Sequence, residues 1–338
     1  MGRRVSVGEA AIRRAASAPG DDRMIFHRRA RSVKMRRAAF CLLPFRQGRA
    51  TFAAMDVHII IVAYDSGEHE RRMGRGPLKL LAAGLDTELE RLGATVFCNT
   101  LFPSEGPGAE IRVAFALQDA VALAVAYARR KGAFPLVLAG NCNTAAVGMV
   151  AGIRSTSGNV PAVCWLDAHA DFNTPETTVS GFLDGMAVSM LTGHCWKSMT
   201  QTVMDFQPVP ESRVVMVGTR AYDPEEAELL ARSAIKRVAA RDVVTLLDAA
   251  LDDARSETEE MYLHLDLDVI DFSDGIANSY ACAGGLMRAE ILDVVDRVAN
   301  RFRIAGAAIT AYDPEHGQDP RVEQLAIEVA KRVVVRSA

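Results

Sequence analysis

The residues best suited to chemistry stand at alternate positions just after an apolar run. Residues 160–166 read Val-Pro-Ala-Val-Cys-Trp-Leu, which predicts a buried parallel strand, and Asp167, His169 and Asp171 follow it. In an extended segment, alternate side chains project to the same side. Two carboxylates and one imidazole on one side of a strand end suit a divalent metal ion. The alternative is a polar loop that carries a few surface charges.

A second acidic strand end strengthens the metal interpretation. Residues 261–271 read Met-Tyr-Leu-His-Leu-Asp-Leu-Asp-Val-Ile-Asp, so Asp266 and Asp268 again stand at alternate positions after an apolar run. Buried carboxylates repel one another and lose their hydration, so two such clusters are costly unless cations neutralise them. Oxygen ligands with one imidazole favour Mn²⁺ over thiolate-seeking metals. The candidate ligands in the two clusters therefore indicate a two-metal site with bridging carboxylates.

The elements that must position these clusters alternate between short apolar strands and helices. One expected helix runs from Pro77 to about Leu92 and another from Ile111 to Lys131. The alternation predicts a single three-layer α/β/α domain with a central, mostly parallel sheet of about eight strands. Open α/β sheets bind ligands at the carboxyl ends of their strands, which is where both acidic clusters fall. Strands are expected at residues 57–63, 94–98, 134–139, 160–166, 213–217, 237–239, 261–266 and 305–310.

Two long motifs resemble the arginase/agmatinase (ureohydrolase) family. They are Asp-Ala-His-Ala-Asp-Phe-Asn-Thr-Pro-Glu-Thr-Thr-Val-Ser-Gly at residues 167–181 and Leu-Asp-Leu-Asp-Val-Ile-Asp at residues 265–271. The resemblance covers roughly residues 56–336 and implies an arginase-like catalytic domain over residues 55–338 that binds two Mn²⁺ ions. It also implies a metal-bound hydroxide that attacks a guanidinium carbon. Under this resemblance Asp167 and Asp266 would bridge the ions, His169 and Asp268 would complete one shell, and Asp171 would serve the other.

The first metal-binding motif of the family departs from its pattern here. The family has Gly-Gly-Asp-His-Ser, and the matching residues 140–144 are Gly-Asn-Cys-Asn-Thr, so Asn143 stands where a histidine ligand is expected. An amide oxygen is a weaker metal ligand than an imidazole, and a thiolate from the neighbouring Cys142 would favour zinc over manganese. We therefore expect the ion that shares Asp171 to bind weakly or not at all.

Two positions at the reacting end of the substrate also depart. Asp184 stands where arginases carry a histidine that assists proton transfer, and Asp184 and His169 are the candidate catalytic residues. Ala311 stands where the family has a glutamate that pairs with the guanidinium group. Asp313 and Glu315 are alternatives for that glutamate, between which the sequence does not choose.

The same resemblance implies a site for the head group of an amino acid. The positions that hold the α-carboxylate in arginases match Asn173, Thr178 and Ser180, and those that contact the α-amino group match Asp223 and Glu226. Structural alternatives exist, because Asp223 is also a good helix N-cap and Asn173 a good turn residue. Together these five residues predict a site for a zwitterionic amino acid.

These observations predict a manganese-dependent hydrolase of the ureohydrolase type, active in amino-acid metabolism. It would cleave a guanidino or amidino C–N bond of an amino acid or a related compound. The alternative is a non-catalytic relative that binds one metal ion, or an amino acid, in a structural or regulatory role. The departures at Asn143, Asp184 and Ala311 motivate this alternative.

Composition limits the partners. The 338 residues are 49% hydrophobic and 24% charged, as in soluble globular proteins, and the net charge of −3 indicates neither nucleic-acid nor membrane binding. The six cysteines are scattered without a CxxC motif, which is typical of free thiols in a reducing cytoplasm. We expect a small guanidino or amidino substrate and, by resemblance, a homo-oligomer, either a trimer or a hexamer.

The first 54 residues differ from the rest. They hold 13 Arg or Lys and 3 Asp or Glu, a net charge of +10, so the remaining residues carry −13. We expect residues 1–54 to form a basic, disordered N-terminal extension, because they lack sustained hydrophobic periodicity. We favour the interpretation that the domain starts near Met55 and that this arm is a dispensable or mis-assigned extension, and an organelle transit peptide and an N-myristoylation signal are the open alternatives.

Overall fold

The central element of the fold is an eight-stranded sheet. The computed structural model describes residues 55–103, 109–256, 258–316 and 318–337, so the expected extension over residues 1–54 lies outside the described residues. All neighbouring strands are parallel, in the order β4-β1-β5-β10-β9-β6-β7-β8. The strands are β1 (Val57–Val62), β4 (Val96–Thr100), β5 (Phe134–Ala139), β6 (Ala162–Leu166), β7 (Val214–Val217), β8 (Lys236–Val238), β9 (Glu260–Asp266) and β10 (Arg303–Thr310).

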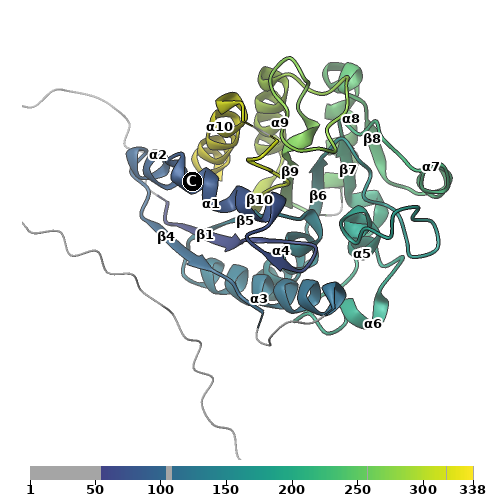
Figure 1. The fold of residues 1–338 in the computed structure, drawn as a ribbon, viewed down its shortest axis with the longest axis horizontal. Helices are drawn as coiled ribbons and strands as arrows, with labels where there is room; N and C mark the ends of the chain where they lie inside the picture. Colours follow the sequence, from purple (N-terminus) through teal and green to yellow (C-terminus); the bar gives the residue numbers. More distant parts are fainter. Residues whose placement is uncertain (1–54, 104–108, 257, 317, 338) are drawn as a thin grey trace, which may run out of the picture. The chain divides into compact units, whose positions relative to one another are not determined.

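Helices cover both faces of this sheet (Figure 1). Helices α1, α2, α8, α9 and α10 pack on one face, and α3, α4 and α5 pack on the other. This arrangement confirms the predicted three-layer α/β/α domain with a parallel sheet. The helices are α1 (Gly76–Ala82), α2 (Leu85–Arg91), α3 (Glu110–Arg130), α4 (Cys142–Ser157), α5 (Ala187–Thr192), α6 (Lys197–Thr200), α7 (Pro224–Ala231), α8 (Val243–Arg255), α9 (Arg288–Arg301) and α10 (Pro320–Ser337).

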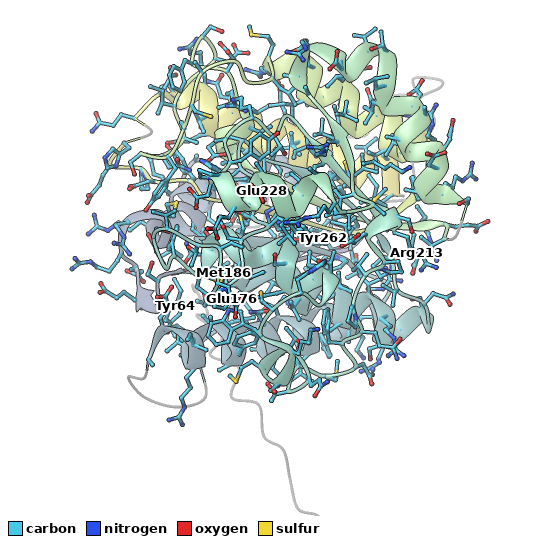
Figure 2. The ribbon with its side chains drawn as sticks, turned by 90° about the vertical axis from the view of Figure 1, so that its right-hand side faces the viewer. Tyr64, Glu176, Met186, Arg213, Glu228 and Tyr262 are labelled. Carbon is cyan, nitrogen blue, oxygen red and sulfur yellow. The ribbon has the colours of Figure 1, made fainter. Side chains whose placement is uncertain are left out.

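Each face of the sheet has its own apolar core. Strand β1 is buried along its whole length because both of its faces are covered by helices. Tyr262 of β9 is fully buried and lies in the middle of the domain (Figure 2). Helix α3 is long and apolar enough to cross a membrane by length and composition alone, but 61% of its apolar window is buried inside the domain. Its burial is therefore that of a core helix.

The structure differs from the expected elements at two places. The single helix expected from Pro77 to about Leu92 is divided into α1 and α2, because Gly84 adopts a left-handed conformation with φ of +96° between them. The sequence also predicts a short helix over residues 181–191, but helix α5 begins only at Ala187, after a 3-10 turn over Asp184–Met186. The residues before this turn instead follow the rim of the site described below.

Glycine at position 140 lets β5 lead directly into α4. A Cβ atom on Gly140 would lie 2.1 Å from the carbonyl oxygen of Tyr64 and 2.7 Å from Cα of Gly74, so no larger residue fits. The first turn of α4 therefore begins at Cys142, close beside the carboxyl ends of the central strands. The residues that the sequence singled out on β6 and β9 meet at this end of the sheet.

Candidate metal centre and active-site cavity

Asp167 is held in place by its own neighbours at the end of β6. The Trp165 indole Nε1–H donates to Asp167 Oδ2 at 3.0 Å, and the backbone N–H of His169 donates to Asp167 Oδ1 at 2.7 Å. Trp165 is itself fixed, because its ring stacks on the buried His264 ring at a centroid distance of 3.5 Å. The carboxylate is therefore both buried and oriented before any ligand binds.

The end of β9 places a second pair of carboxylates next to Asp167. The Asp268 N–H donates to Asp266 Oδ1 at 2.8 Å. His169 Nδ1 lies 3.2 Å from Asp268 Oδ2 and 3.5 Å from Asp167 Oδ1. Strands β6 and β9 are direct neighbours, so the two acidic clusters form one site. Asp271, the third acid of the second cluster, lies apart and accepts hydrogen bonds from Ser273 and Gly285.

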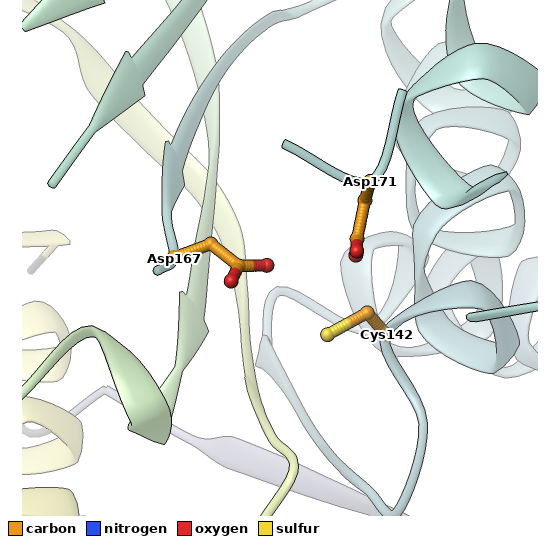
Figure 3. Close-up of side chains that lie close together, drawn as sticks. All are labelled: Cys142, Asp167 and Asp171. Atoms are coloured by element: carbon orange, nitrogen blue, oxygen red, sulfur yellow. The ribbon is translucent and has the colours of Figure 1, made fainter. Parts of the chain in front are cut away.

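Asp171 and Cys142 project toward Asp167 from the other side (Figure 3). Asp171 has a positive φ of +49°, which is uncommon for a residue with a side chain and is often kept at functional sites. Cys142 Sγ donates to Asp266 Oδ2 at 3.0 Å and lies 3.1 Å from Thr310 Oγ1. The thiol therefore belongs to the same cluster as the carboxylates.

Two sets of ligand atoms share Asp167. Cys142, Asp167 and Asp171 form one set, and Asp167, His169 and Asp268 form the other; within each set the ligand atoms lie within 4.8 Å of one another. A carboxylate common to two adjacent sets is what a two-metal site requires. The structure thus brings together all five residues that were predicted as ligands from the two acidic motifs. Asp266 lies between the two sets, because it accepts hydrogen bonds from Cys142 of one set and from Asp268 of the other.

Burial and mutual repulsion shift the pKa values of these groups. Burial, followed by the charge of Asp268, raises the pKa of Asp167 to about 6. Burial, followed by neighbouring carboxylates, raises the pKa values of Asp171 and Asp266 well above their usual range. Burial acts to lower the pKa of His169, but hydrogen bonds to Asp167 and Asp268 outweigh it and raise that pKa. Without a metal ion, a protonated His169 ring would supply positive charge beside these carboxylates, and a bound cation would take over that role as the ring loses its proton and becomes a nitrogen ligand.

The residues present fit divalent metal ions. The Asp171 side chain is more than nine-tenths buried, and within the described ranges no hydrogen bond reaches its carboxylate. A buried carboxylate without a donor is costly, and a cation shared with Asp167 removes that cost. His169 and Asp268 offer a nitrogen and an oxygen ligand, which are the ligand types of a manganese site.

Asp184 and Asn143 bind each other beside the metal ligands. The backbone N–H and Nδ2 of Asn143 donate to Asp184 Oδ1 at 2.7 and 3.1 Å, and Asn141 Nδ2 donates to Oδ2 at 2.9 Å. Burial raises the pKa of Asp184 to about 7. Asn143 Oδ1 is buried and has no hydrogen-bond partner in the part of the chain that the structure describes. It is therefore free to serve as the weak ligand that the sequence predicted.

A cavity of about 340 Å³ opens beside this cluster. The five residues predicted to bind the substrate all line it, together with metal-ligand candidates: Asn173, Thr178, Ser180, Asp223, Glu226, His169, Asp171, Asp266 and Asp268. Asn173 Nδ2 donates to Asp223 Oδ2 at 3.1 Å. Glu226 accepts the backbone N–H groups of Phe172 and Asp223, so the capping box of α7 also fixes the cavity wall.

Ala311 stands where the family has a glutamate, and the structure places neither Asp313 nor Glu315 at the reacting end of the cavity. Glu315 pairs with Arg75, and Asp313 accepts the Glu315 N–H, and neither acid lines the cavity. Ala311 lines the cavity and has a positive φ of +60°. Neither acid therefore takes the place of the missing glutamate in this structure.

Sequence reasoning missed other polar residues near the cavity. Asp65 is buried at the end of the short hairpin strand β2 (Tyr64–Asp65), where it accepts a hydrogen bond from Arg72 at 2.9 Å and lies 3.4 Å from Asn141 Nδ2. Asn278 and Tyr280 also line the cavity. Asp65 could have been found from its position shortly after the buried strand β1, because Asp167 was predicted from the same kind of position after β6.

Comparisons with known proteins agree with this geometry. The model of the Arginase family matches residues 55–335. An arginase from Bacillus caldovelox is 28% identical over 273 residues, which cover 76% of this chain and 91% of the relative. An arginase from Glaciozyma antarctica is 29% identical over 301 residues, covering 82% and 85%. The solved Bacillus caldovelox arginase matches with a TM-score of 0.75 at 25% identity and covers 83% of this chain and 98% of that one. The chain belongs to the arginase family.

Proposed function

We propose that this protein is a hydrolase that uses two divalent metal ions to cleave the C–N bond of a guanidino or amidino group. The substrate would be an amino acid or a closely related compound. The observation that carries the proposal is the pair of ligand sets that share Asp167 and stand at one end of a cavity of about 340 Å³. Membership of the arginase family, whose matched relatives are arginases, supports it.

The chain's own residues have separable tasks in this proposal. Asp167, Asp266, His169 and Asp268 would hold and orient the ions, and Mn²⁺ is the ion proposed for the set that contains His169. When bound, the ions would supply a hydroxide nucleophile near neutral pH. Three of these residues, Asp167, Asp266 and Asp268, are almost fully buried, and backbone and side-chain hydrogen bonds hold their carboxylates in fixed positions.

Asp184 is the proposed proton carrier. It lines the cavity, and burial places its pKa at about 7, so it can take up and release a proton near neutral pH. Asn141 and Asn143 hold both of its oxygens in place. A proton on the Asp184 carboxyl could then pass to the leaving amine, the task that a histidine at this position would otherwise perform.

The far wall of the cavity supports an amino-acid substrate. Asn173, Thr178 and Ser180 offer amide and hydroxyl groups for a carboxylate, and Asp223 offers negative charge for an ammonium group. We therefore expect a substrate that keeps both an α-amino and an α-carboxylate group. A compound that lacks the carboxylate would lose part of its binding energy.

The test is a substrate panel. The purified protein is freed of metal, reloaded with Mn²⁺ alone or with Mn²⁺ and Zn²⁺, and incubated with arginine, agmatine, guanidinobutyrate and formiminoglutamate. Urea, ammonia and formamide are measured, with Asp268→Asn as the matched inactive control. We expect turnover of arginine or formiminoglutamate above that of agmatine. Tight metal binding without turnover of any compound would refute the hydrolase and favour the non-catalytic alternative.

A further inference from the structure

The thiol of Cys142 occupies a place in the metal cluster that the sequence assigned to Asn143. Both residues begin α4, and Cys142 Sγ lies with Asp167 and Asp171 in one set of ligand atoms, all within 4.8 Å of one another. Figure 3 shows the three side chains pointing to a common space. The Asn143 amide instead donates to Asp184. The first turn of α4 therefore presents sulfur to the carboxylates.

The hydrogen bonds around Cys142 suit a metal-bound sulfur. Tyr262 OH lies 2.6 Å from His264 Nδ1, His264 Nε2 lies 3.2 Å from Thr310 Oγ1, and Thr310 Oγ1 lies 3.1 Å from Cys142 Sγ. The Thr310 hydroxyl also lies 3.3 Å from the carbonyl oxygen of Leu265, to which it donates. These buried contacts behind the sulfur hold the Cys142 side chain in its orientation toward the carboxylates, as contacts behind a metal ligand do.

Asp171 provides an independent indication that this space is meant for a cation. Its side chain is only 7% exposed, and the described part of the chain gives its carboxylate no hydrogen-bond donor. It nevertheless points toward Cys142 and Asp167, and without a cation the Asp167 carboxylate repels it (Figure 3). The positive φ of Asp171 shows that the backbone is held in an uncommon conformation to aim this side chain.

We propose that Cys142 is a thiolate ligand of the ion held by Asp167 and Asp171, and that this half of the site selects Zn²⁺ over Mn²⁺. The inference rests on the proposed two-metal function and specifies one of its ions. One sulfur with carboxylate oxygens is a ligand set for a borderline-soft ion, whereas Mn²⁺ prefers oxygen and imidazole. On binding, the S–H bond breaks, the proton leaves to solvent, and a metal–sulfur bond forms.

The experiment uses Co²⁺ as a visible substitute for Zn²⁺ in the metal-free, full-length protein. Titration should produce a thiolate-to-cobalt charge-transfer band in the near ultraviolet. Zn²⁺ should remove the band, whereas Mn²⁺ at the same concentration should leave it. In Cys142→Ser the band should be absent and zinc affinity at this site should fall at least about tenfold, which is about 1.4 kcal/mol. Cys195→Ser, the same change at another buried cysteine, should behave as the wild type.

The outcomes separate this inference from the proposed function. Two bound cobalt ions without a thiolate band would overturn the role of Cys142 and leave the two-metal hydrolase intact. A protein that binds neither Co²⁺, Zn²⁺ nor Mn²⁺ would overturn both. Loss of one of the two bound ions in Asn143→Ala, with both ions retained in Cys142→Ser, would return the ligand role to the neighbouring residue.

A second pair of variants covers the case in which Cys142→Ser does not fold. Asp171→Asn removes a partner of the same ion while the thiol remains, so the band should be lost or strongly weakened. Asp268→Asn affects the other ion, so the band should persist. A band that survives in Asp171→Asn and disappears in Asp268→Asn would overturn the assignment.

Discussion

Replacing Asp171 by Asn should stabilise the metal-free protein and destabilise the metal-loaded one. The carboxyl group is buried, receives no hydrogen bond from the described residues, and faces other carboxylates. Burial, followed by the charges of Asp167 and Asp184, raises its pKa well above the usual range. At neutral pH the metal-free fold therefore carries the cost either of a buried charge or of a proton held against its normal pKa. An amide of the same shape carries no charge and takes up no proton, so it avoids both costs.

The size of the effect follows from the same contacts. Removing a buried polar group that lacks a partner typically recovers about 1–3 kcal/mol, and charged groups recover more. At about 3 °C per kcal/mol for a chain of this size, the metal-free Asp171→Asn variant should melt about 3–9 °C above the wild type. A bound ion at 100 times its Kd stabilises by about 2.7 kcal/mol, and a tenfold loss of affinity reduces this to about 1.4 kcal/mol. The gain in melting temperature on adding metal should therefore be clearly smaller in the variant.

Differential scanning calorimetry of both proteins, after chelation and after reloading, measures these shifts. Asp271→Asn is the matched control, because Asp271 lies apart from the cluster and is bound by Ser273 and Gly285. The reasoning is refuted if metal-free Asp171→Asn melts below the wild type, or if metal raises the melting temperatures of both proteins equally.

Three further predictions concern pH, substrate binding and the N-terminal arm. The folded pKa values of Asp167 and Asp184, about 6 and about 7, are raised, so the folded state keeps protons that the unfolded chain has lost. The unfolding free energy of metal-free protein should thus fall from pH 4 toward about pH 7 in urea titrations, and bound metal should flatten this decline. Asn173→Ala should raise the KM for arginine about tenfold, or about 1.4 kcal/mol, with a much smaller change for agmatine, which lacks the carboxylate; equal changes would argue against a carboxylate contact. A chain that begins at Met55 should melt within a few degrees of the full-length protein, and insolubility would contradict the proposal that residues 1–54 are a dispensable extension.

Much of the fold follows from local sequence signals. Apolar runs such as residues 134–139 predict buried strands because a parallel sheet covered on both faces has no solvent-facing side. The spacing Asp223-x-x-Glu226 after a loop predicts the capping box of α7, since both side chains act on backbone groups within one turn. Boundaries were less predictable, as the division at Gly84 shows, because an isolated glycine can lie inside a helix or end it.

The metal ligands on β6 and β9 were predictable for a similar reason. Asp167, His169, Asp266 and Asp268 alternate at strand ends, and alternation together with a parallel sheet places them at one edge. That β6 and β9 are neighbours is a property of the whole sheet, since β7 and β8 lie between them in the chain. The sequence predicts that the two acidic clusters lie at the same edge of the sheet, and the strand order places them side by side.

Which side chain of the first turn of α4 lies beside Asp167 and Asp171 is visible only in the tertiary structure. Cys142 and Asn143 are adjacent on a helix, where successive side chains point about 100° apart, so Cys142 Sγ lies with Asp167 and Asp171 while the Asn143 amide nitrogen donates to Asp184. Sequence comparison chose Asn143 because it occupies the place of a histidine. The rotation of α4, fixed by its packing on α3 and by the close fit at Gly140, instead directs the sulfur to the carboxylates and the amide to Asp184. The motifs predict that metal ions bind at this end of the sheet, and the orientation of one helix turn decides which side-chain atoms lie there to hold them.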